Sequence, residues 1–386
     1  MNFSIADIFF VIVIFQLLFI SIFLYTHEKG RKLSNRLLAS FFLSVSLNLI
    51  DSFLAIQKVY SSNPSLAGWG SCLPLLFGPL LFLYTQSVLY KDFRLSLRRW
   101  LHFLPAILFF SITEISYLLQ SRELQTKILN SIIERNIPLP VYGITAVIFL
   151  QFFVYTCASL LLIERYKKIA SNHFSDQQRT NIHWLSSTIV FFTVCMLVAG
   201  LNGFIGLTPL AKYYYISLFI IVAVVFVFIN RVLLKALREP AIFSLIEEKE
   251  PSGSVQTNPA GAQYPGSALT TEVKQELLLR LQQHMQTKKP WLEAELTLEQ
   301  LAGMLSVKPK ALSQVINELL QKNFFEFVNY YRIEEAKRLL TNPADKKITV
   351  LEVLYEVGFN SKSSFNTIFK KQTGLTPSEF KRRQAE

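Results

Sequence analysis

Seven apolar runs in the N-terminal part of the chain restrict the fold more than any other feature. An apolar helix of about 20 residues is long enough to cross the hydrocarbon core of a bilayer. Only 17% of the 386 residues are charged, against roughly 25% in an ordinary soluble protein. The sequence therefore predicts a seven-helix transmembrane bundle. Its runs are residues 7–25, 37–56, 69–89, 100–119, 139–163, 184–207 and 213–230.

Basic residues between the runs predict the orientation of this bundle. Cytoplasmic loops are enriched in Lys and Arg. With the N-terminus outside, the inner segments hold Lys29, Arg31, Lys32, Arg36, Lys91, Arg94, Arg98, Arg99, Arg165, Lys167, Lys168, Arg179, Arg231, Lys235 and Arg238. The outer segments hold only Lys58, Arg122, Lys127, Arg135 and Lys212. We therefore expect a multi-pass protein of the inner (cytoplasmic) membrane with its N-terminus outside and its C-terminus in the cytoplasm.

Two carboxylates, Asp51 and Glu114, lie within the second and fourth runs, toward their outer ends. Ionisable residues inside a membrane are costly and frequently functional, so the two residues are the candidates for a ligand pocket. The alternative is that both are interfacial carboxylates that reach the outer water.

The composition changes sharply after the last run. Residues 239–271 are rich in Pro, Gly, Ser and acidic side chains, without sustained periodicity, which is typical of a linker. About 30 flexible residues span on the order of 30 Å. The sequence thus predicts three parts: a transmembrane domain over residues 1–238, a linker over 239–271 and an all-helical domain over 272–386.

The C-terminal part contains a turn followed by a helix and then a second, capped helix. Gly358 suits a tight turn, and Ser361 can cap the next helix. Phe365, Ile368 and Phe369 form the apolar stripe of that helix. Gly374 ends it, and Thr376 begins a capping box with Glu379. Together these signals predict a helix-turn-helix.

A similar pattern occurs earlier in the same domain. Thr297 and Gln300 have the spacing of a capping box, and Pro309 opens the helix that follows. Residues 323–340 between the two patterns predict one long connecting helix. Lys308 departs from the expected pattern, because a lysine is a poor helix cap.

This domain resembles the AraC/XylS-type helix-turn-helix transcription regulators. The resemblance is carried by Gly358-Phe359, Phe365, Phe369 to Lys371 and Gly374 to Pro377, with Arg332, Ala336, Leu339 and Leu340 in the connecting helix. It covers residues 273–383 and implies binding to promoter DNA through two successive major grooves. Leu354 departs from the pattern of this family, which usually has a small Ala at that position. Residues 73–84 and 102–105 are similar, less specifically, to the sensor half of seven-transmembrane regulators of the AraC type.

Side-chain chemistry assigns candidate roles on the two recognition helices. Amide, hydroxyl and ammonium groups can read base edges, whereas basic side chains near a helix end contact phosphates. The candidate base contacts are Lys310, Ser313, Gln314, Asn317, Ser363, Asn366 and Thr367, and the candidate phosphate contacts are Lys370, Lys371, Lys381, Arg382 and Arg383. The alternative for each of them is an ordinary solvated helix surface.

The sequence contains no phosphate-binding G-x-x-x-x-G-K-[ST] loop, no H-E-x-x-H and no metal-ligand spacing among its five histidines. We therefore expect no cofactor, no metal and no enzymatic activity. The hypothesis is a membrane-anchored one-component transcription regulator whose bundle senses a small-molecule or membrane-derived signal. Its expected partners are double-stranded DNA, the lipid bilayer, a second copy in a homodimer and RNA polymerase. The alternative is a multi-span transporter or receptor with an accessory cytoplasmic domain.

Overall fold

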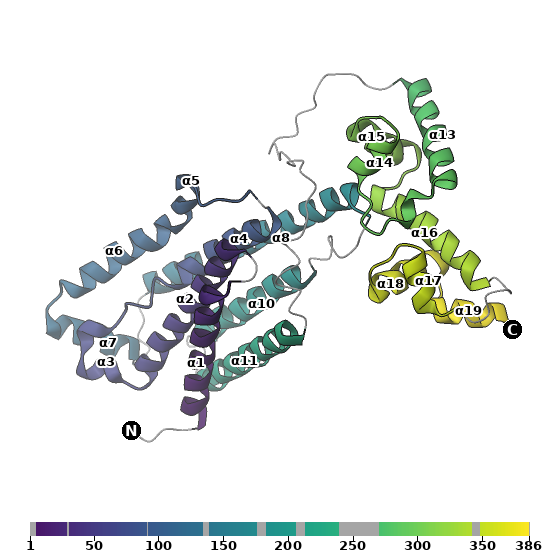
Figure 1. Cartoon of the computed structure of the whole chain (residues 1–386). Helices are drawn as coiled ribbons and strands as arrows, with labels where there is room; N and C mark the ends of the chain where they lie inside the picture. Colours follow the sequence, from purple (N-terminus) through teal and green to yellow (C-terminus); the bar gives the residue numbers. More distant parts are fainter. Residues whose placement is uncertain are drawn as a thin grey trace. The chain divides into compact units, whose positions relative to one another are not determined.

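The computed structural model describes residues 5–28, 31–90, 92–133, 139–175, 183–205, 213–238, 270–341 and 348–385. Over these ranges the chain is helical, apart from connecting turns and one isolated antiparallel bridge between Phe174 and Thr297 (Figure 1). The predicted all-α fold class is confirmed.

The chain divides into two compact units. One comprises Met1–Ile163 and His183–Pro251, and the other comprises Glu164–Ile182 and Ser252–Glu386. The described residues 164–175 thus group with the C-terminal part in this division. Most of the predicted linker, residues 239–269, lies outside the described residues, so the linker stays a prediction.

Each of the seven apolar runs forms a helix. These are α1 (Ile5–Thr26), α2 (Lys32–Ile56), α4 (Pro74–Leu89), α6 (Leu104–Leu118), α8 (Leu139–His173), α10 (His183–Ile205) and α11 (Tyr214–Arg238). Among the described residues, five helical stretches are long and apolar enough to cross a membrane, and Pro74–Leu89 and Phe219–Phe228 are shorter apolar helices. The structure adds shorter elements between the runs: α3 (Val59–Ser62), η1 (Pro64–Leu66), α5 (Leu97–Trp100), η2 (Leu101–Phe103) and α7 (Arg122–Ile133).

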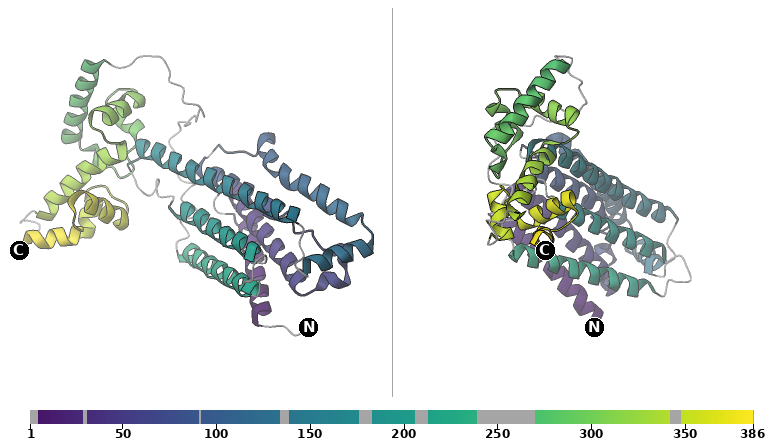
Figure 2. Two further views of the ribbon diagram at one scale, coloured as in Figure 1. Left: turned by 180° about the vertical axis from the view of Figure 1, so that it is seen from behind. Right: turned by 90° about the vertical axis from the view of Figure 1, so that its right-hand side faces the viewer.

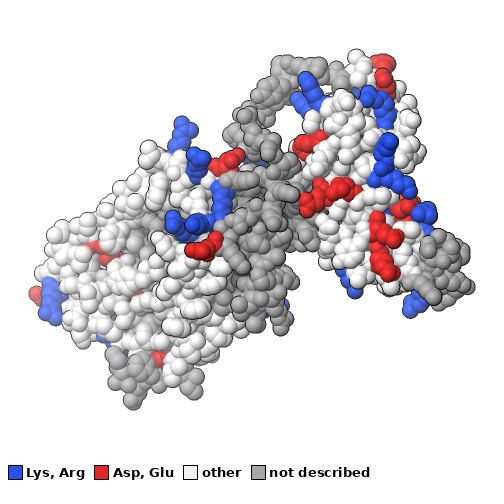
Figure 3. All heavy atoms as spheres, viewed as in Figure 1, with Lys and Arg blue, Asp and Glu red and all other residues white. Residues whose placement is uncertain are grey.

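Packing within the N-terminal unit is strongest between helices that follow one another. α1 packs against α2, α2 against α4, and α10 runs beside α11 (Figure 2). Val13, Leu17 and Leu83 are almost completely buried there, whereas Phe15 and Leu150 are 68% and 64% exposed. Apolar side chains therefore occupy both the inner and the outer faces of these helices. Figure 3 shows that the visible face of this unit carries few charged side chains along its helices.

The C-terminal unit contains two helix-turn-helix motifs joined by one long helix. Its helices are α13 (Thr271–Thr287), η4 (Pro290–Leu292), α14 (Leu298–Met304), α15 (Pro309–Leu319), α16 (Phe324–Thr341), α17 (Val350–Glu356), α18 (Lys362–Thr373) and α19 (Pro377–Ala385). Each motif has its own hydrophobic core, and α16 contributes to both cores. Leu354 is fully buried in the second core, so its size is accommodated.

Capping signals set the helix starts where the sequence placed them. Capping boxes join Thr297 to Gln300 and Thr349 to Glu352. A third joins Thr376 to Glu379. Ser361 accepts a hydrogen bond from the backbone N–H of Ser364, whereas Lys308 makes no capping hydrogen bond. The caps predicted at Thr297, Ser361 and Thr376 and the poor cap predicted at Lys308 are confirmed.

The turn at Gly358 lies in close contact with backbone atoms at the start of the first motif. Gly358 has a φ of +82°, and a Cβ there would lie 2.6 Å from the carbonyl oxygen of Leu292 and 2.9 Å from that of Trp291. A residue with a Cβ would therefore meet both a strained backbone conformation and two backbone oxygens.

We expect Gly358→Ala to destabilise a fragment of residues 270–386 by at least about 2 kcal/mol, since left-handed strain alone costs about 1–2 kcal/mol. Gly303→Ala is the matched control, because its Cβ would meet nothing within 4 Å and alanine favours a helix by about 0.5–1 kcal/mol. Gly374→Ala, with a φ of +79° in open space, should fall between the two. Urea denaturation followed by circular dichroism measures all three. Equal stability of the Gly358 and Gly374 variants would contradict the close approach.

Candidate nucleic-acid interface

The first recognition helix, α15, has one buried face and one polar face. Leu312, Val315 and Ile316 are fully buried. Lys310 and Asn317 are exposed on the other side, and Ser313 and Gln314 are partly exposed. The structure therefore brings the four predicted base-contact residues of this helix together on one outward face.

The second recognition helix, α18, has the same arrangement. Phe365 and Phe369 are fully buried, and Ile368 is nearly so. Ser363 and Thr367 are exposed, and Asn366 is partly exposed. Both helices thus present short polar side chains of the size and chemistry that fit the major groove.

Local hydrogen bonds hold several of these polar side chains in place. The Gln314 amide donates to the Glu318 carboxylate at 2.9 Å. The Asn317 amide donates to the Ser313 hydroxyl at 3.2 Å. The Thr367 hydroxyl donates to the Ser363 carbonyl at 2.8 Å. A base edge approaching these groups would find them ordered before binding, which lowers the entropic cost of recognition.

Glu318 is a group on this surface that the sequence interpretation missed. Its carboxylate also pairs with Lys274 of α13 at 2.7 Å. The hydrogen bonds from Lys274 and then Gln314 hold the pKa of Glu318 below its usual value. The carboxylate therefore stays ionised and orients Gln314. Its position one helical turn after Gln314 was the available signal, because residues at i and i+4 are neighbours on a helix.

The predicted phosphate contacts do not form a uniform set. Lys370, Arg382 and Arg383 are exposed. The Lys371 side chain is 74% exposed, and its Nζ lies 3.5 Å from Oε1 of Glu326. Lys381 is only partly exposed and donates to the carbonyl of Ile348. Lys381 therefore ties α19 to the segment before α17, while the other four remain oriented toward solvent.

Asp51 and Glu114 hold one loop from two sides. Asp51 accepts a hydrogen bond from the Tyr60 hydroxyl at 2.7 Å, and Glu114 accepts one from the Ser71 hydroxyl at 2.8 Å. A Cβ on Gly70 would lie 2.6 Å from Cγ of Asp51, and one on Gly68 would lie 2.9 Å from Oε2 of Glu114. Both carboxylates thus have internal partners, and their role in a ligand pocket stays a prediction.

Arg332 is a second residue whose role the sequence did not reveal beyond a family motif. It lies on α16, is 1% exposed, and donates from Nε to the Trp291 carbonyl at 2.8 Å and from Nη2 to the Glu293 carbonyl at 2.7 Å. Its guanidinium carbon also lies 5.5 Å from the ring centroid of Phe359. The signal was its helical spacing from Val328 and Ala336, which places Arg332 on the buried face.

Within the described ranges, no group of three His, Cys, Asp or Glu side chains is arranged to hold a metal ion.

Comparison with known proteins supports the same assignment for this domain. Residues 301–383 match the family described as a helix-turn-helix domain. The transcriptional regulatory protein YesN of Bacillus subtilis is 35% identical over 82 residues, which are 21% of this chain and 22% of that protein. An HTH-type transcriptional regulator in the cgkA 5′ region of Pseudoalteromonas carrageenovora is 51% identical over 51 residues, 13% of this chain and 28% of the relative.

The HTH-type transcriptional regulator YijO of Escherichia coli is 33% identical over 87 residues, 22% of this chain and 30% of the relative. Among solved structures, the C-terminal domain of AraT, a response regulator from Geobacillus stearothermophilus, is 30% identical, with a TM-score of 0.25; the match covers 28% of this chain and 84% of that one. The chain thus spans less than a third of the length of these curated relatives.

The C-terminal domain is therefore a helix-turn-helix domain. Its duplicated motif and connecting helix make it one of the AraC type.

Two of the three capping boxes, those that contain Glu352 and Glu379, make the stability of this domain depend on pH. Hydrogen bonds from the backbone and hydroxyl of Thr349 lower the pKa of Glu352, and those of Thr376 lower the pKa of Glu379. A carboxylate with a depressed pKa stabilises the fold above its unfolded pKa of about 4.3, and this contribution is lost as pH falls through the lower folded value.

We therefore expect the urea midpoint of residues 270–386 to fall as pH decreases below about 4.3, and Glu352→Gln with Glu379→Gln to flatten this dependence. Glutamine keeps the capping hydrogen bond but does not titrate. Glu356→Gln, at the end of α17 and outside any capping box, is the control. A double variant with the unchanged acid slope of the parent would show that these carboxylates do not contribute.

Proposed function

We propose that this chain is a membrane-anchored one-component transcription regulator that binds promoter DNA sequence-specifically through its paired helix-turn-helix motifs. The observation that carries the proposal is the pair of recognition helices, α15 and α18, each with a buried apolar face and an outward polar face. Similarity to HTH-type transcriptional regulators over the same residues supports it.

The fixed geometry between the two motifs supports binding of the two recognition helices to two major grooves of the DNA. α16 is a single helix of 18 residues, and both motif cores pack on it. Arg332 and the close approach at Gly358 add contacts between the motifs. A rigid separation between recognition helices suits two successive major grooves on one face of a duplex.

The polar side chains of α15 and α18 indicate how the domain would recognise a DNA sequence. Gln314, Asn317 and Asn366 carry amides that can pair with adenine, and Lys310 can donate to guanine. Ser313, Ser363 and Thr367 can bind either base edges or phosphates. The phosphate contacts position the domain on the DNA backbone, which carries no sequence information; the proposed residues are Lys370, Lys371, Lys381, Arg382 and Arg383.

The apolar helices of the N-terminal unit support membrane anchoring, and the alternation of basic segments supports a cytoplasmic C-terminus. A signal bound by this unit would act through different affinities for two arrangements of its helices. The polar cluster around Asp51 and Glu114 is the candidate for the sensing site. Homodimer formation and contact with RNA polymerase belong to the same hypothesis.

We expect Asn366→Ala to weaken binding to a selected cognate duplex by about 1–3 kcal/mol and to leave binding to a scrambled duplex unchanged. Arg383→Ala is the matched control. It should weaken both duplexes equally and lower the slope of log K against log salt by about one unit. Fluorescence anisotropy with a selected duplex over a salt series measures both. Equal loss on the two duplexes for the Asn366 variant would falsify its base-reading role.

Reporter fusions test the orientation. Green fluorescent protein fused after Glu386 should fluoresce, because the C-terminus is proposed to lie in the cytoplasm. Alkaline phosphatase fused after Gln120, in a proposed outer segment, should be active, because that enzyme matures only outside the cytoplasm. The reverse pattern would place the DNA-binding domain away from the genome and end the proposal.

A further inference from the structure

A short segment at the C-terminal end of α8 contacts the helix-turn-helix domain. Phe174 forms the antiparallel bridge with Thr297. The backbone N–H of Ser175 donates to the Leu296 carbonyl at 3.3 Å, and its hydroxyl donates to the same oxygen at 2.7 Å. His173 Nδ1 lies 2.9 Å from the Glu299 carboxylate, and this contact lowers the pKa of Glu299. We refer to residues 173–175 as the strap; they belong to the same compact unit as the domain.

The strap reaches the residue that joins the two motifs. The Ser175 carbonyl accepts hydrogen bonds from the Asn329 amide at 3.1 Å and from Nη1 of Arg332 at 3.4 Å. Nη2 of Arg332 lies 3.4 Å from the Ser175 hydroxyl oxygen. Ser175 is 1% exposed, and so are Asn329 and Arg332. The polar atoms of Ser175 are thus satisfied by hydrogen bonds to the C-terminal domain, as buried polar groups in folded proteins normally are.

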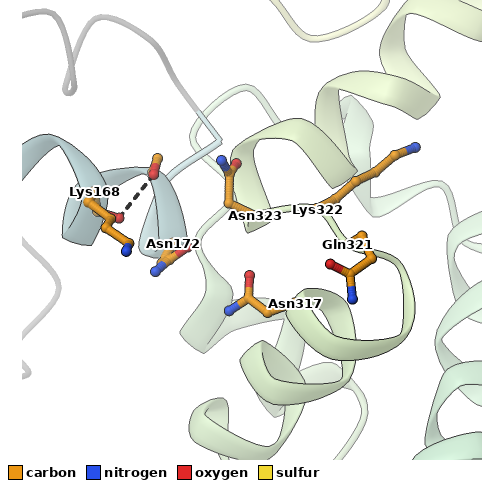
Figure 4. Close-up of a pocket in the computed structure, with 7 residues that line it drawn as sticks. Lys168, Asn172, Asn317, Gln321, Lys322 and Asn323 are labelled. Atoms are coloured by element: carbon orange, nitrogen blue, oxygen red, sulfur yellow. Dashed lines mark hydrogen bonds between the residues drawn. The ribbon is translucent and has the colours of Figure 1, made fainter.

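The end of α8 also lies close to the first recognition helix. Lys168, Ser171 and Asn172 line a polar pocket of about 300 Å³. Figure 4 shows Lys168 and Asn172 on one side of it, with Asn317, Gln321 and Asn323 on the other. Asn317 is a proposed base contact, so a displacement of this part of α8 would change the surroundings of the DNA-reading face.

We propose that the strap is a docking element through which α8 controls the joint between the two helix-turn-helix motifs. When seated, Ser175 supplies acceptors for two nitrogens of the Arg332 guanidinium and holds the first motif through Leu296. When released, Arg332 loses these acceptors and the joint loosens. α8 is one continuous helix from Leu139 to His173 whose earlier residues belong to the N-terminal unit, so it is a direct covalent route for a signal. The control step rests on the proposed function, whereas the docking does not.

A disulfide trap tests the docking in the full-length protein. Cys72, Cys157 and Cys195 are first replaced by Ala, and Phe174→Cys is combined with Thr297→Cys. Residues opposite each other in an antiparallel bridge have Cα atoms about 4.5–5.5 Å apart, within the reach of a disulfide. A site for a sequence-specific protease is inserted within residues 239–269. Phe174→Cys with Thr341→Cys, an exposed position on α16, is the matched control pair.

After oxidation in membrane vesicles and proteolysis, we expect the Phe174/Thr297 pair to keep the two fragments joined until a reductant is added, and the control pair to release them. Adding Ser175→Pro, which lacks both the N–H and the hydroxyl, should reduce the cross-linked fraction at least fivefold. Ser171→Ala should leave it unchanged. Equal cross-linking of the two pairs, or no effect of Ser175→Pro, would overturn the docking whatever the DNA result.

DNA binding then tests the control step. With a duplex selected by the full-length protein, the oxidised Phe174/Thr297 variant should bind about tenfold more tightly than the same protein with Ser175→Pro. Equal affinities would overturn control of the joint by the strap. A cross-link that forms as expected in a protein that binds no duplex in any state would instead overturn the proposed function and leave the docking intact.

Discussion

The C-terminal unit depends on a buried charge at the joint between its two motifs. Arg332 is 1% exposed, and an isolated guanidinium at such a position would cost several kcal/mol. The carbonyl oxygens of Trp291 and Glu293 offset that cost, and the ring of Phe359 covers the group from the second motif. Loss of these acceptors would leave the Arg332 guanidinium buried without hydrogen bonds. Arg332 therefore holds the segment around η4 and the second turn in one arrangement. The separation of the recognition helices is therefore specified by electrostatics as well as by packing.

The two motifs meet the same backbone requirement with different residues. At the first turn Ser306 has a φ of +55°, and Ser306 and Val307 donate to the carbonyls of Gly303 and Ala302. At the second, Gly358 and Phe359 donate in the same pattern to Tyr355 and Leu354. A serine can adopt the left-handed conformation for about 1–2 kcal/mol, but Gly358 lies against backbone oxygens where no Cβ fits. The same register pairs Ala302 with Leu354, and the second core accommodates the larger side chain.

Features set by neighbouring residues could be predicted from the sequence, and contacts between distant residues could not. The capping boxes, the turn at Gly358 and the apolar faces of α15 and α18 follow from residues within one or two helical turns. The contacts of Ser175 with Leu296 and Arg332 join positions more than a hundred residues apart, and no periodicity reports them. Lys381 shows the same limit within the site: its hydrogen bond to the Ile348 carbonyl is a tertiary contact that its charge does not predict, and its phosphate contact stays a prediction. The short helix α7 was missed because its polar sequence lies between two apolar runs.

Two segments of the chain connect the units: the predicted linker, and α8 with the strap. They differ in how strongly they constrain the orientation of the helix-turn-helix motifs. The predicted linker, as a flexible chain of about 30 residues, would allow distances on the order of 30 Å and could not transmit an orientation. The strap differs, because its backbone and hydroxyl groups are fixed by Leu296, Asn329 and Arg332 in a buried environment. A rotation or shift of α8 would act on these hydrogen bonds directly, and Arg332 would pass the change to both motifs. A one-component regulator of this design needs no phosphotransfer step, since the signal-dependent element would itself be part of the joint that sets the spacing of the DNA-reading helices.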